Sequence, residues 1–407
     1  MRHSCGPADD RRTEARSEAT IMATSHWRWP LFEARHSELA TRFADWADVN
    51  LTPYEADEGG DGRAARLIFE ALARDGWLRS TSPSNEHGLS PDLRAVCLLR
   101  EICGQSSAIA DVALSEPWLG ALPLIVGGSA ELRRKYLPGY LAGSLLPAFA
   151  LSEPDAGSDV QAITTSARRE GSHFVINGRK TWTSNCGLAD LYIVFSRMDG
   201  EERRSGIAAF AVEPADGGLV FERRLEVLSP HTVGTWRLEE CRVPASRLIG
   251  GVDAGLRIAL RSLEIFRPTV GAAAVGFARR ALDEAVRRSL SRRAFNKPIA
   301  EHQLIQAKLA EMATDLDAAT LLVYRAAWNA DTGGGSGREA AMAKLYASEA
   351  AHRIIDSAVQ IFGGMGIRKG EVVERLYRHV RAFRIFDGTS EIQKLIIARS
   401  LLADAGK

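Results

Sequence analysis

An acidic residue next to a glycine stands near the end of the chain, in the stretch RIFDGTSEIQKLIIARSLL (residues 384–402). Asp387 precedes Ser390 and Gln393, whose spacing is typical of a capping box and predicts a helix that begins at Ser390. Free N–H groups and the positive end of the helix dipole favour an anion at such a place. Asp387 is therefore either a carboxylate that stabilises the helix end or a candidate general base.

Two segments in the middle of the chain offer groups that could hold a heteroaromatic ring. The first, FALSEPDAGSDV, supplies the hydroxyls of Ser152 and Ser158 together with many backbone N–H groups. In the second, KTWTSNCG, Trp182 could cover a ring face while Ser184 reaches a ring nitrogen. A tight turn and a half-buried strand tryptophan are the structural alternatives.

Two further segments, RRAFNKPIAEHQ and QIFGGMGI, could bind phosphate and amide groups. Arg292 could contact a phosphate and Gln303 an amide. The pair Gly363-Gly364 would let the backbone approach a ligand closely, because glycine lacks a Cβ atom. A helix end and a glycine cap are the structural alternatives here.

The composition restricts the class of protein. With 407 residues, 45% hydrophobic and 25% charged, the chain is long enough for two or three packed domains. A net charge of +1 gives no bulk attraction for nucleic acid or for an anionic membrane. No apolar run approaches the roughly 18 residues that a membrane span requires. Five cysteines without metal-binding spacing predict a reduced cytoplasmic protein with no metal site.

The elements that must position these groups follow the order helices, strands, helices. Residues 1–24, polar and mixed in charge, predict a disordered tail, and residues 25–146 carry apolar residues at helical spacing. Residues 147–250 contain short β-prone runs separated by turn residues, which predict a small antiparallel sandwich or barrel. Residues 251–407 return to helical spacing and predict a bundle.

Local signals set the expected starts and turns of these elements. Ser90 and Ser129 are expected N-caps of two helices. The Asn177-Gly178 dipeptide in HFVINGRKTW predicts a β-hairpin turn. From Gln303 onward, apolar residues at three- and four-residue steps predict one seam of the bundle, namely Ile305, Leu309, Met312, Leu316, Ala319, Val323 and Ala327.

Five segments together resemble the acyl-CoA dehydrogenase family. No GxGxxG follows a strand, so a Rossmann nucleotide site is not expected. Instead LSEPDAGSD, NGRKTWTSN, RRAFNKPIAEHQ, QIFGGMGI and FDGTSEIQ match this family in content, order and spacing, over roughly residues 30–403. The resemblance implies an N-terminal helical domain, a central β domain and a C-terminal four-helix bundle, divided here at 25–146, 147–250 and 251–407.

The resemblance also implies the ligands and the residues that hold them. FAD would be bound by Phe149, Leu151, Ser152, Ser158, Trp182, Ser184, Arg292, Phe295, Gln303, Gln360, Gly364, Thr389 and Glu391. The acyl thioester, carried by CoA or by a carrier protein, would contact Ser158, Glu264, Arg267, Phe386 and Gly388. The set from Arg292 to Gly364 would serve the FAD of a neighbouring subunit, so a homodimer or homotetramer is implied.

The implied reaction is an FAD-dependent α,β-dehydrogenation with electron-transfer flavoprotein as the acceptor. Asp387 would remove the α-proton of the thioester, and the flavin N5 would accept the β-hydrogen as hydride. The family's usual base here is glutamate, which is longer by one C–C bond of about 1.5 Å. Some members take the base from the position of Phe266, which cannot serve. Asp387 would need a pKa near 6–7.

Two other functions remain open on the sequence alone. An oxidase of a more acidic carbon acid, such as nitroalkane oxidase with its aspartate base, would also fit Asp387. Glu264 and Arg267 in the CoA region argue against that activity. A weakly active family relative with a structural or binding role is the third possibility, which Asp387 and Trp182 disfavour.

Overall fold

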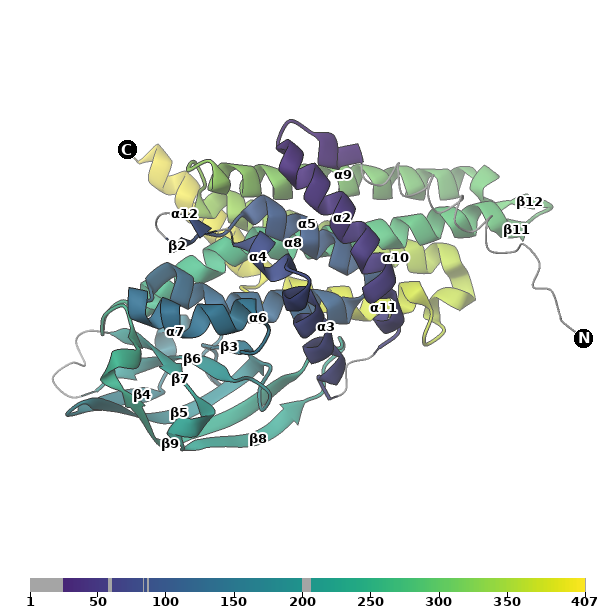
Figure 1. Cartoon of the computed structure of the whole chain (residues 1–407). Helices are drawn as coiled ribbons and strands as arrows, with labels where there is room; N and C mark the ends of the chain where they lie inside the picture. The colour runs from purple at the N-terminus through teal and green to yellow at the C-terminus, as the bar shows by residue number, and fades with distance from the viewer. Residues whose placement is uncertain (1–24, 58–60, 83, 86–87, 200–205, 407) are drawn as a thin grey trace, which may run out of the picture.

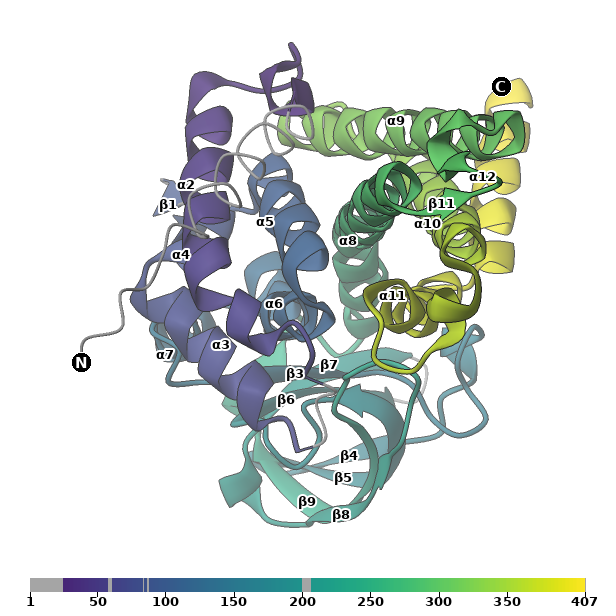
Figure 2. The same cartoon turned by 90° about the vertical axis from the view of Figure 1, so that its right-hand side faces the viewer.

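The computed structural model describes residues 25–406 except 58–60, 83, 86–87 and 200–205. The tail predicted at residues 1–24 lies outside the described residues. Two helical groups sandwich a central helix, and a β-sheet lies against one side of the helices (Figure 1; Figure 2). The predicted order of helices, strands and helices is confirmed. The boundaries proposed between the three domains stay predictions.

The first helical group packs around one strongly apolar helix. Its helices are α2 (Ala34–Asn50), α3 (Arg63–Arg74), α4 (Trp77–Thr81), α5 (Leu93–Ser106), α6 (Ala108–Gly127) and α7 (Ala130–Leu141). Helix α6 is long and apolar enough to cross a membrane, but 83% of its most apolar window is buried inside the protein. It therefore serves as a core helix.

One of the two predicted helix caps is confirmed. The Ser129 hydroxyl accepts a hydrogen bond from the N–H of Leu132, at 3.2 Å, and caps α7. The cap predicted at Ser90 is wrong, because the Asp92 carboxylate accepts from the N–H of Ala95 at 3.1 Å and begins α5. A charged cap also interacts favourably with the helix dipole.

The β region forms one eight-stranded sheet in the order β10-β7-β6-β4-β5-β9-β8, with β3 paired to β6. The strands are β3 (Pro147–Ala150), β4 (Ser166–Glu170), β5 (His173–Ser184), β6 (Leu191–Met198), β7 (Ile207–Val212), β8 (Leu219–Leu225), β9 (Val233–Pro244) and β10 (Leu248–Ile249). Most pairs are antiparallel, as predicted. Strand β6 pairs in parallel with β3 and β4, so the sheet is mixed.

The hairpin predicted at Asn177-Gly178 is wrong. Strand β5 continues through this dipeptide, and its register against β9 shifts there in a bulge. A Cβ atom on Gly178 would lie 2.4 Å from the hydroxyl oxygen of Thr165, the residue before β4, so this close approach requires the glycine. The Asn177 side chain accepts from the N–H of Glu240 at 2.8 Å. The turn lies instead at Gly171, where φ is 58°.

The C-terminal group is a bundle built on one long helix. It contains α8 (Gly255–Ser291), α9 (Gln303–Asp331), α10 (Gly337–Phe362), α11 (Val372–Val380) and α12 (Ser390–Ala405). Helix α8 lies between α5 and α10 (Figure 2). Five positions of the predicted seam of α9 are buried, namely Met312, Leu316, Ala319, Val323 and Ala327. The first two, Ile305 and Leu309, are only partly buried against the same core.

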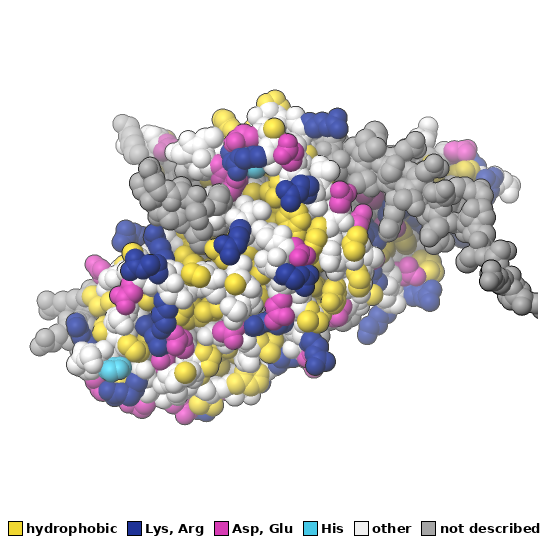
Figure 3. Space-filling model, viewed as in Figure 1, with side chains coloured by type: hydrophobic (Ala, Val, Ile, Leu, Met, Phe, Trp, Pro, Cys, Tyr) yellow, Lys and Arg dark blue, Asp and Glu magenta, His cyan; other side chains and the backbone are white. Residues whose placement is uncertain are grey.

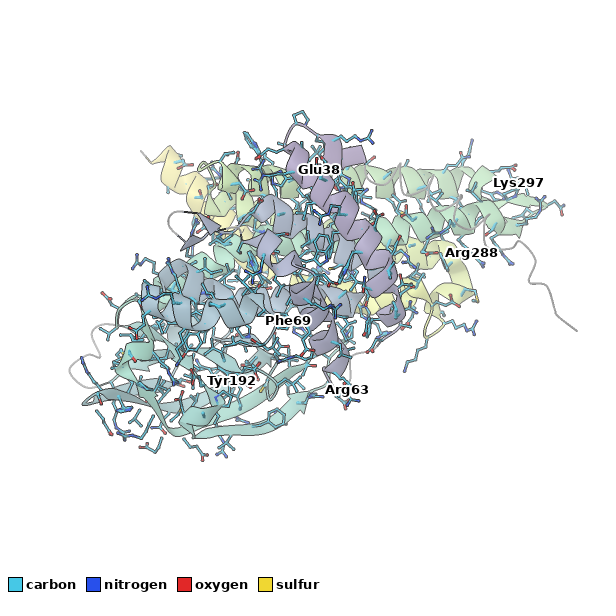
Figure 4. All side chains as sticks on the ribbon, viewed as in Figure 1. Glu38, Arg63, Phe69, Tyr192, Arg288 and Lys297 are labelled. Carbon is cyan, nitrogen blue, oxygen red and sulfur yellow. The ribbon has the colours of Figure 1, made fainter. Side chains whose placement is uncertain are left out.

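A short hairpin projects from the end of the bundle that lies away from the sheet (Figure 1). It consists of β11 (Arg293–Ala294) and β12 (Lys297–Pro298), and Lys297 is labelled near its tip in Figure 4. On the face shown in Figure 3, basic and acidic side chains are interspersed, in agreement with the small net charge.

Candidate active site

Asp387 lies in a tight turn at the start of α12. Its φ is 56° and that of Gly388 is 91°, so two successive residues adopt the left-handed conformation. The helix begins at Ser390 as predicted, but the cap is Thr389, whose hydroxyl accepts from the N–H of Ile392 at 3.3 Å. The predicted capping role of Ser390 is wrong, because its hydroxyl donates to the carboxylate of Glu349 at 2.6 Å.

Two buried side chains hold this turn in place. The Lys344 ammonium of α10 and the Gln393 amide of α12 both donate to the carbonyl oxygen of Gly388, each at 2.8 Å. Neither contact is among those predicted from the sequence. Because Lys344 is 44 residues away from Gly388, no local pattern could have revealed its contact.

The surroundings of Asp387 raise the pKa of its carboxyl group toward neutrality. Burial raises the pKa of Asp387 to about 7, and the charge of Glu116 raises it as well. The positive charges of Lys344 and Arg100 act in the opposite direction and lower it. A carboxylate with this pKa is suited to accept a proton at pH 7.

A cluster of polar side chains lies near Asp387, and the sequence analysis had identified only its serine. The His231 Nε2 atom is 2.9 Å from the Ser184 Oγ atom and 4.0 Å from a carboxylate oxygen of Glu116. Burial lowers the pKa of His231 to about 4 and raises the pKa of Glu116. Glu116 belongs to α6 and His231 to the β8–β9 connection, so neither lies near a recognisable motif.

A buried arginine of α5 lies beside this cluster. Arg100 donates two hydrogen bonds to Asp111, at 2.8 and 2.9 Å, and a third to Thr269 at 2.9 Å. Its guanidinium lies 4.9 Å from the centre of the Phe266 ring, which also stacks on Trp118. The position that carries the base in some relatives is therefore filled here by a packed aromatic ring.

The segment around Ser152 is fastened to β5 by a buried ion pair. The Lys180 ammonium donates to Glu153 at 2.9 Å and to the carbonyl oxygen of Leu151 at 3.0 Å. The N–H of Thr181 donates to the carbonyl oxygen of Ser152 at 3.0 Å. These bonds bring side by side the two segments that are expected to bind a ring.

The groups exposed at this place fit a planar heteroaromatic ring. Trp182 has a φ of 55°, and 60% of its surface is exposed although its neighbours on β5 are buried. The hydroxyls of Ser152 and Ser158 make no hydrogen bond to a described residue. An uncovered indole beside free hydroxyls matches the stacking and polar edge contacts that FAD requires. Leu151 is buried in the hydrophobic core and Phe149 packs against it. Their contacts with FAD stay predictions.

The remaining residues expected to bind FAD form a second group. Arg292, Phe295 and Gln303 lie on or next to the projecting hairpin, and Gln360 and Gly364 lie at the end of α10, all exposed. Within one chain the structure does not bring the hairpin group to the sheet side of the molecule, where Trp182 lies (Figure 1). Thr389 and Glu391 lie at the start of α12, next to Asp387.

The residues expected to bind substrate line the middle of α8 and the Asp387 turn. Arg267 is buried, and its Nε atom has no hydrogen-bond partner among the described residues. Glu264 pairs with Arg261 at 3.1 Å and lines an open cavity of about 840 Å³ at the start of α8. Phe386 and Gly388 flank Asp387 in the turn, and Ser158 is exposed.

Comparison with known proteins agrees with this architecture. The N-terminal, middle and C-terminal domains of acyl-CoA dehydrogenase match residues 33–144, 148–240 and 253–402. The 3-(aryl)acrylate reductase of Clostridium sporogenes is 37% identical over 91% of this chain and all of its own length. The CarC subunit of the caffeyl-CoA reductase-Etf complex of Acetobacterium woodii is 36% identical over 88% of this chain and 96% of its own.

A solved structure shows the same fold with the cofactor in place. The acyl-CoA dehydrogenase of Bacillus anthracis complexed with FAD superimposes with a TM-score of 0.85 at 30% identity, over 92% of this chain and 68% of that chain. The expectation of FAD is confirmed with the family. The chain belongs to the acyl-CoA dehydrogenase family of FAD-dependent oxidoreductases.

Proposed function

We propose that this enzyme removes the α- and β-hydrogens of an acyl thioester and that Asp387 is the base that takes the α-proton. The observation that carries the proposal is the position of Asp387 in a turn that Lys344 and Gln393 hold through the carbonyl oxygen of Gly388. Burial there raises the pKa of Asp387 to about 7. A base whose pKa lies near the working pH combines a useful ionised fraction with adequate basicity.

The backbone of the same turn offers a group for the thioester carbonyl. The N–H of Asp387 makes no hydrogen bond to a described residue. A hydrogen bond from this N–H to the thioester carbonyl oxygen would stabilise the negative charge that develops on that oxygen as the α-proton leaves. The carboxylate of Asp387 would thus accept the α-proton, and its backbone N–H would donate to the carbonyl oxygen. Lys344 and Gln393 hold the turn that carries both groups.

The exposed face of Trp182 and the free hydroxyls of Ser152 and Ser158 would hold and orient the cofactor. Bound FAD supplies the acceptor, at its N5 atom, for the β-hydrogen that leaves as hydride. The ion pair of Lys180 and Glu153 joins the segment that carries Ser152 to the strand that carries Trp182. It would thereby fix the positions of these binding groups relative to each other. The protein's own part is therefore to bind, orient and deprotonate.

The carrier part of the thioester would lie along the start of α8. Arg257, Arg261 and Glu264 line the cavity there, and their spacing places them on one face of the helix. Two guanidinium groups on an open cavity are suited to the phosphates of a CoA thioester. The unpaired Nε atom of Arg267 offers a further donor deeper along the same helix.

Electron-transfer flavoprotein is the proposed acceptor of the electrons. The relative from Acetobacterium woodii is named as a subunit of a complex with Etf, which supports this partner. A homo-oligomer is proposed as well, because Arg292, Phe295 and Gln303 would otherwise have no cofactor to bind. The cytoplasmic location stays a prediction.

The experiment is anaerobic mixing of the FAD-loaded enzyme with a panel of acyl-CoA thioesters, followed by the flavin absorbance. The proposal expects at least one thioester to bleach the flavin band without oxygen. Nitroalkanes are the second arm of the experiment, with oxygen uptake as the readout. Bleaching by no CoA or carrier-protein thioester would contradict the proposal, and rapid peroxide release with a nitroalkane would favour the oxidase instead.

A further inference from the structure

One carboxylate of α10 is bonded to both ends of the turn that carries Asp387. The Glu349 Oε1 atom accepts a hydrogen bond from the Ser390 hydroxyl at 2.6 Å and another from the Arg384 Nε–H at 2.9 Å. Arg384 lies three residues before Asp387, and Ser390 lies three residues after it, at the start of α12. A single oxygen atom therefore joins the two sides of the turn. We call Glu349, Arg384 and Ser390 the Glu349 clamp.

We propose that Glu349 is a positioning residue, which fixes the Asp387 carboxylate at the place from which it takes the α-proton. The inference rests on the proposed function, because it assumes that Asp387 is the base. It adds a residue of α10 that acts on the reaction through the backbone of the turn, and to which the mechanism proposed above gives no task.

Helix α10 contacts the turn at its centre and at both ends. At the centre, the Lys344 ammonium donates to the carbonyl oxygen of Gly388 at 2.8 Å. At the ends, the two hydrogen bonds of Glu349 hold the residues before and after that centre. Asp387 has a φ of 56°, a conformation that costs energy for a residue other than glycine and persists where its surroundings enforce it. Contacts on both sides of Asp387 provide that enforcement.

The Glu349 clamp is a charged contact that is partly shielded from water. The side chain of Glu349 is 25% exposed and that of Arg384 34%, and Ser390 is buried. Burial raises the pKa of Glu349, but the hydrogen bonds from Ser390 and Arg384 outweigh burial and hold the pKa below its ordinary value. Glu349 is therefore a carboxylate at pH 7. Hydrogen bonds to a carboxylate are shorter and stronger than those between neutral groups.

An aspartate base depends strongly on the backbone that carries it. The Asp387 side chain is shorter than that of a glutamate by one C–C bond of about 1.5 Å, so it has fewer torsions with which to correct a displaced backbone. A misplacement of about 1 Å can cost roughly a hundredfold in rate. The residue that anchors both ends of the turn should therefore control the rate of proton removal.

The test measures single-turnover reduction of the flavin in variants of Glu349. The FAD-loaded enzyme is mixed anaerobically with an acyl-CoA thioester that bleaches the wild-type flavin, and the rate constant and the amplitude are recorded separately. Inactive protein lowers the amplitude and leaves the rate constant unchanged. Glu349→Leu should lower the limiting rate constant by about 10–100-fold, and the thioester concentration that gives half of this limit should change by less than about threefold.

Two conservative variants separate the reach of the side chain from its charge. Glu349→Gln keeps an oxygen atom at the same place without the charge, and should retain most of the wild-type rate constant. Glu349→Asp keeps the charge but is shorter by about 1.5 Å, so it should be nearly as slow as Glu349→Leu. Ser390→Ala removes one of the two hydrogen bonds. It should lower the rate constant of the wild type, but not further that of Glu349→Leu, because residues that act through one contact are not additive.

Asp315→Leu is the matched control. The Asp315 carboxylate of α9 is also 25% exposed, and it accepts two hydrogen bonds from Arg353 of α10, at 2.9 and 3.0 Å. Its loss removes a comparable ion pair, which α10 makes with α9 rather than with the turn. The rate constant of Asp315→Leu should therefore equal that of the wild type.

Each outcome bears on one of the two proposals. A wild-type rate constant in Glu349→Leu overturns the inference and leaves the proposed function standing. An equal loss in Asp315→Leu also overturns it, and so does a Glu349→Asp variant that is faster than Glu349→Gln. If Glu349→Leu does not fold, Ser390→Ala and the comparison of the two conservative variants decide. Bleaching of the wild type by no thioester ends the proposed function, and the inference falls with it.

Discussion

At the scale of single residues, the reactivity of Asp387 depends on groups that lie far from it in the sequence. Lys344 comes from α10, Arg100 from α5 and Glu116 from α6, and all three act on the same carboxyl group. Burial and Glu116 favour the neutral acid, whereas Lys344 and Arg100 favour the carboxylate. The resulting pKa of about 7 is a balance that a single substitution should move.

Lys344→Met should raise the pKa of Asp387 above 7, because the ammonium group lowers it. The reaction needs the carboxylate, so the rate of flavin bleaching rises with pH through this pKa. The midpoint of the anaerobic rate–pH profile should therefore move to higher pH, and the rate at pH 7 should fall. Lys344→Arg should restore part of the shift, since it restores the charge.

Lys369→Met provides the matched control, because Lys369 is exposed in the connection before α11. Its profile should coincide with that of the wild type. A midpoint in Lys344→Met that stays in place or moves to lower pH would contradict the assigned electrostatic role of Lys344.

At the scale of elements, the site depends on how β5 is joined to the segment before it. Glu153 accepts from Lys180 of β5 and from the N–H groups of Thr164 and Thr165, at 2.7 and 3.0 Å. These bonds lower the pKa of Glu153 to about 2, burial acting in the opposite direction. The carboxylate thus organises the segment that carries Ser152 and fixes it beside Trp182.

Lys180→Met should destabilise the protein by ~3–5 kcal/mol, because it leaves the Glu153 charge buried without its partner. The flavin-to-protein ratio after purification should fall as well. Urea unfolding and the flavin absorbance measure the two effects. The double variant Lys180→Met, Glu153→Leu should recover stability but not the order of the segment. Wild-type stability in the single variant would exclude a role for the ion pair.

The sequence predicted the type and order of the elements better than their ends. The α9 seam is correct because its apolar spacing is repeated over many turns. The hairpin predicted at Asn177-Gly178 is wrong because the glycine is required by the close approach of Thr165. The residues next to Gly178 in the sequence do not reveal this contact. The caps at Ser90 and Ser390 are displaced because Asp92, two residues after Ser90, and Thr389, directly before Ser390, offer competing side chains.

Some residues of the candidate site could be predicted from the sequence, and others could not. Asp387, Trp182, Ser152 and Ser184 belong to continuous motifs and could be selected from the sequence. Lys344 and the pair Glu116 and His231 act through contacts between distant elements. Their residue types are common in helices and connections, so only the fold assigns them to the site.

At the scale of the whole molecule, the projecting hairpin presents apolar side chains to solvent. Phe295 is 90% exposed, Leu304 at the start of α9 is 81% exposed, and Ile367 in the turn after α10 is 78% exposed. Exposed apolar groups of this size are typical of a surface that another chain covers. Arg292 and Gln303, which are expected to contact the FAD of a neighbouring subunit, lie beside these apolar side chains. Formation of the oligomer and binding of FAD would therefore depend on the same surface.

Phe295→Asp should weaken the oligomer, because it places a charge at the centre of the proposed contact. It should also lower the FAD content, since the neighbouring subunit would no longer complete the cofactor site. Light scattering after size-exclusion chromatography and the flavin-to-protein ratio measure both. Phe295→Leu, which remains apolar, should stay close to wild type. An unchanged mass and an unchanged FAD content in Phe295→Asp would disprove the shared site.

The most direct measurement is the anaerobic reduction of the flavin in Asp387→Asn. Asparagine has the shape of aspartate and tolerates the φ of 56°, so the turn and the bound FAD should be retained. The account predicts a bleaching rate lower by about 10²–10⁴-fold, the usual contribution of a general base. Bleaching at the wild-type rate, with FAD still bound, would show that another group removes the α-proton.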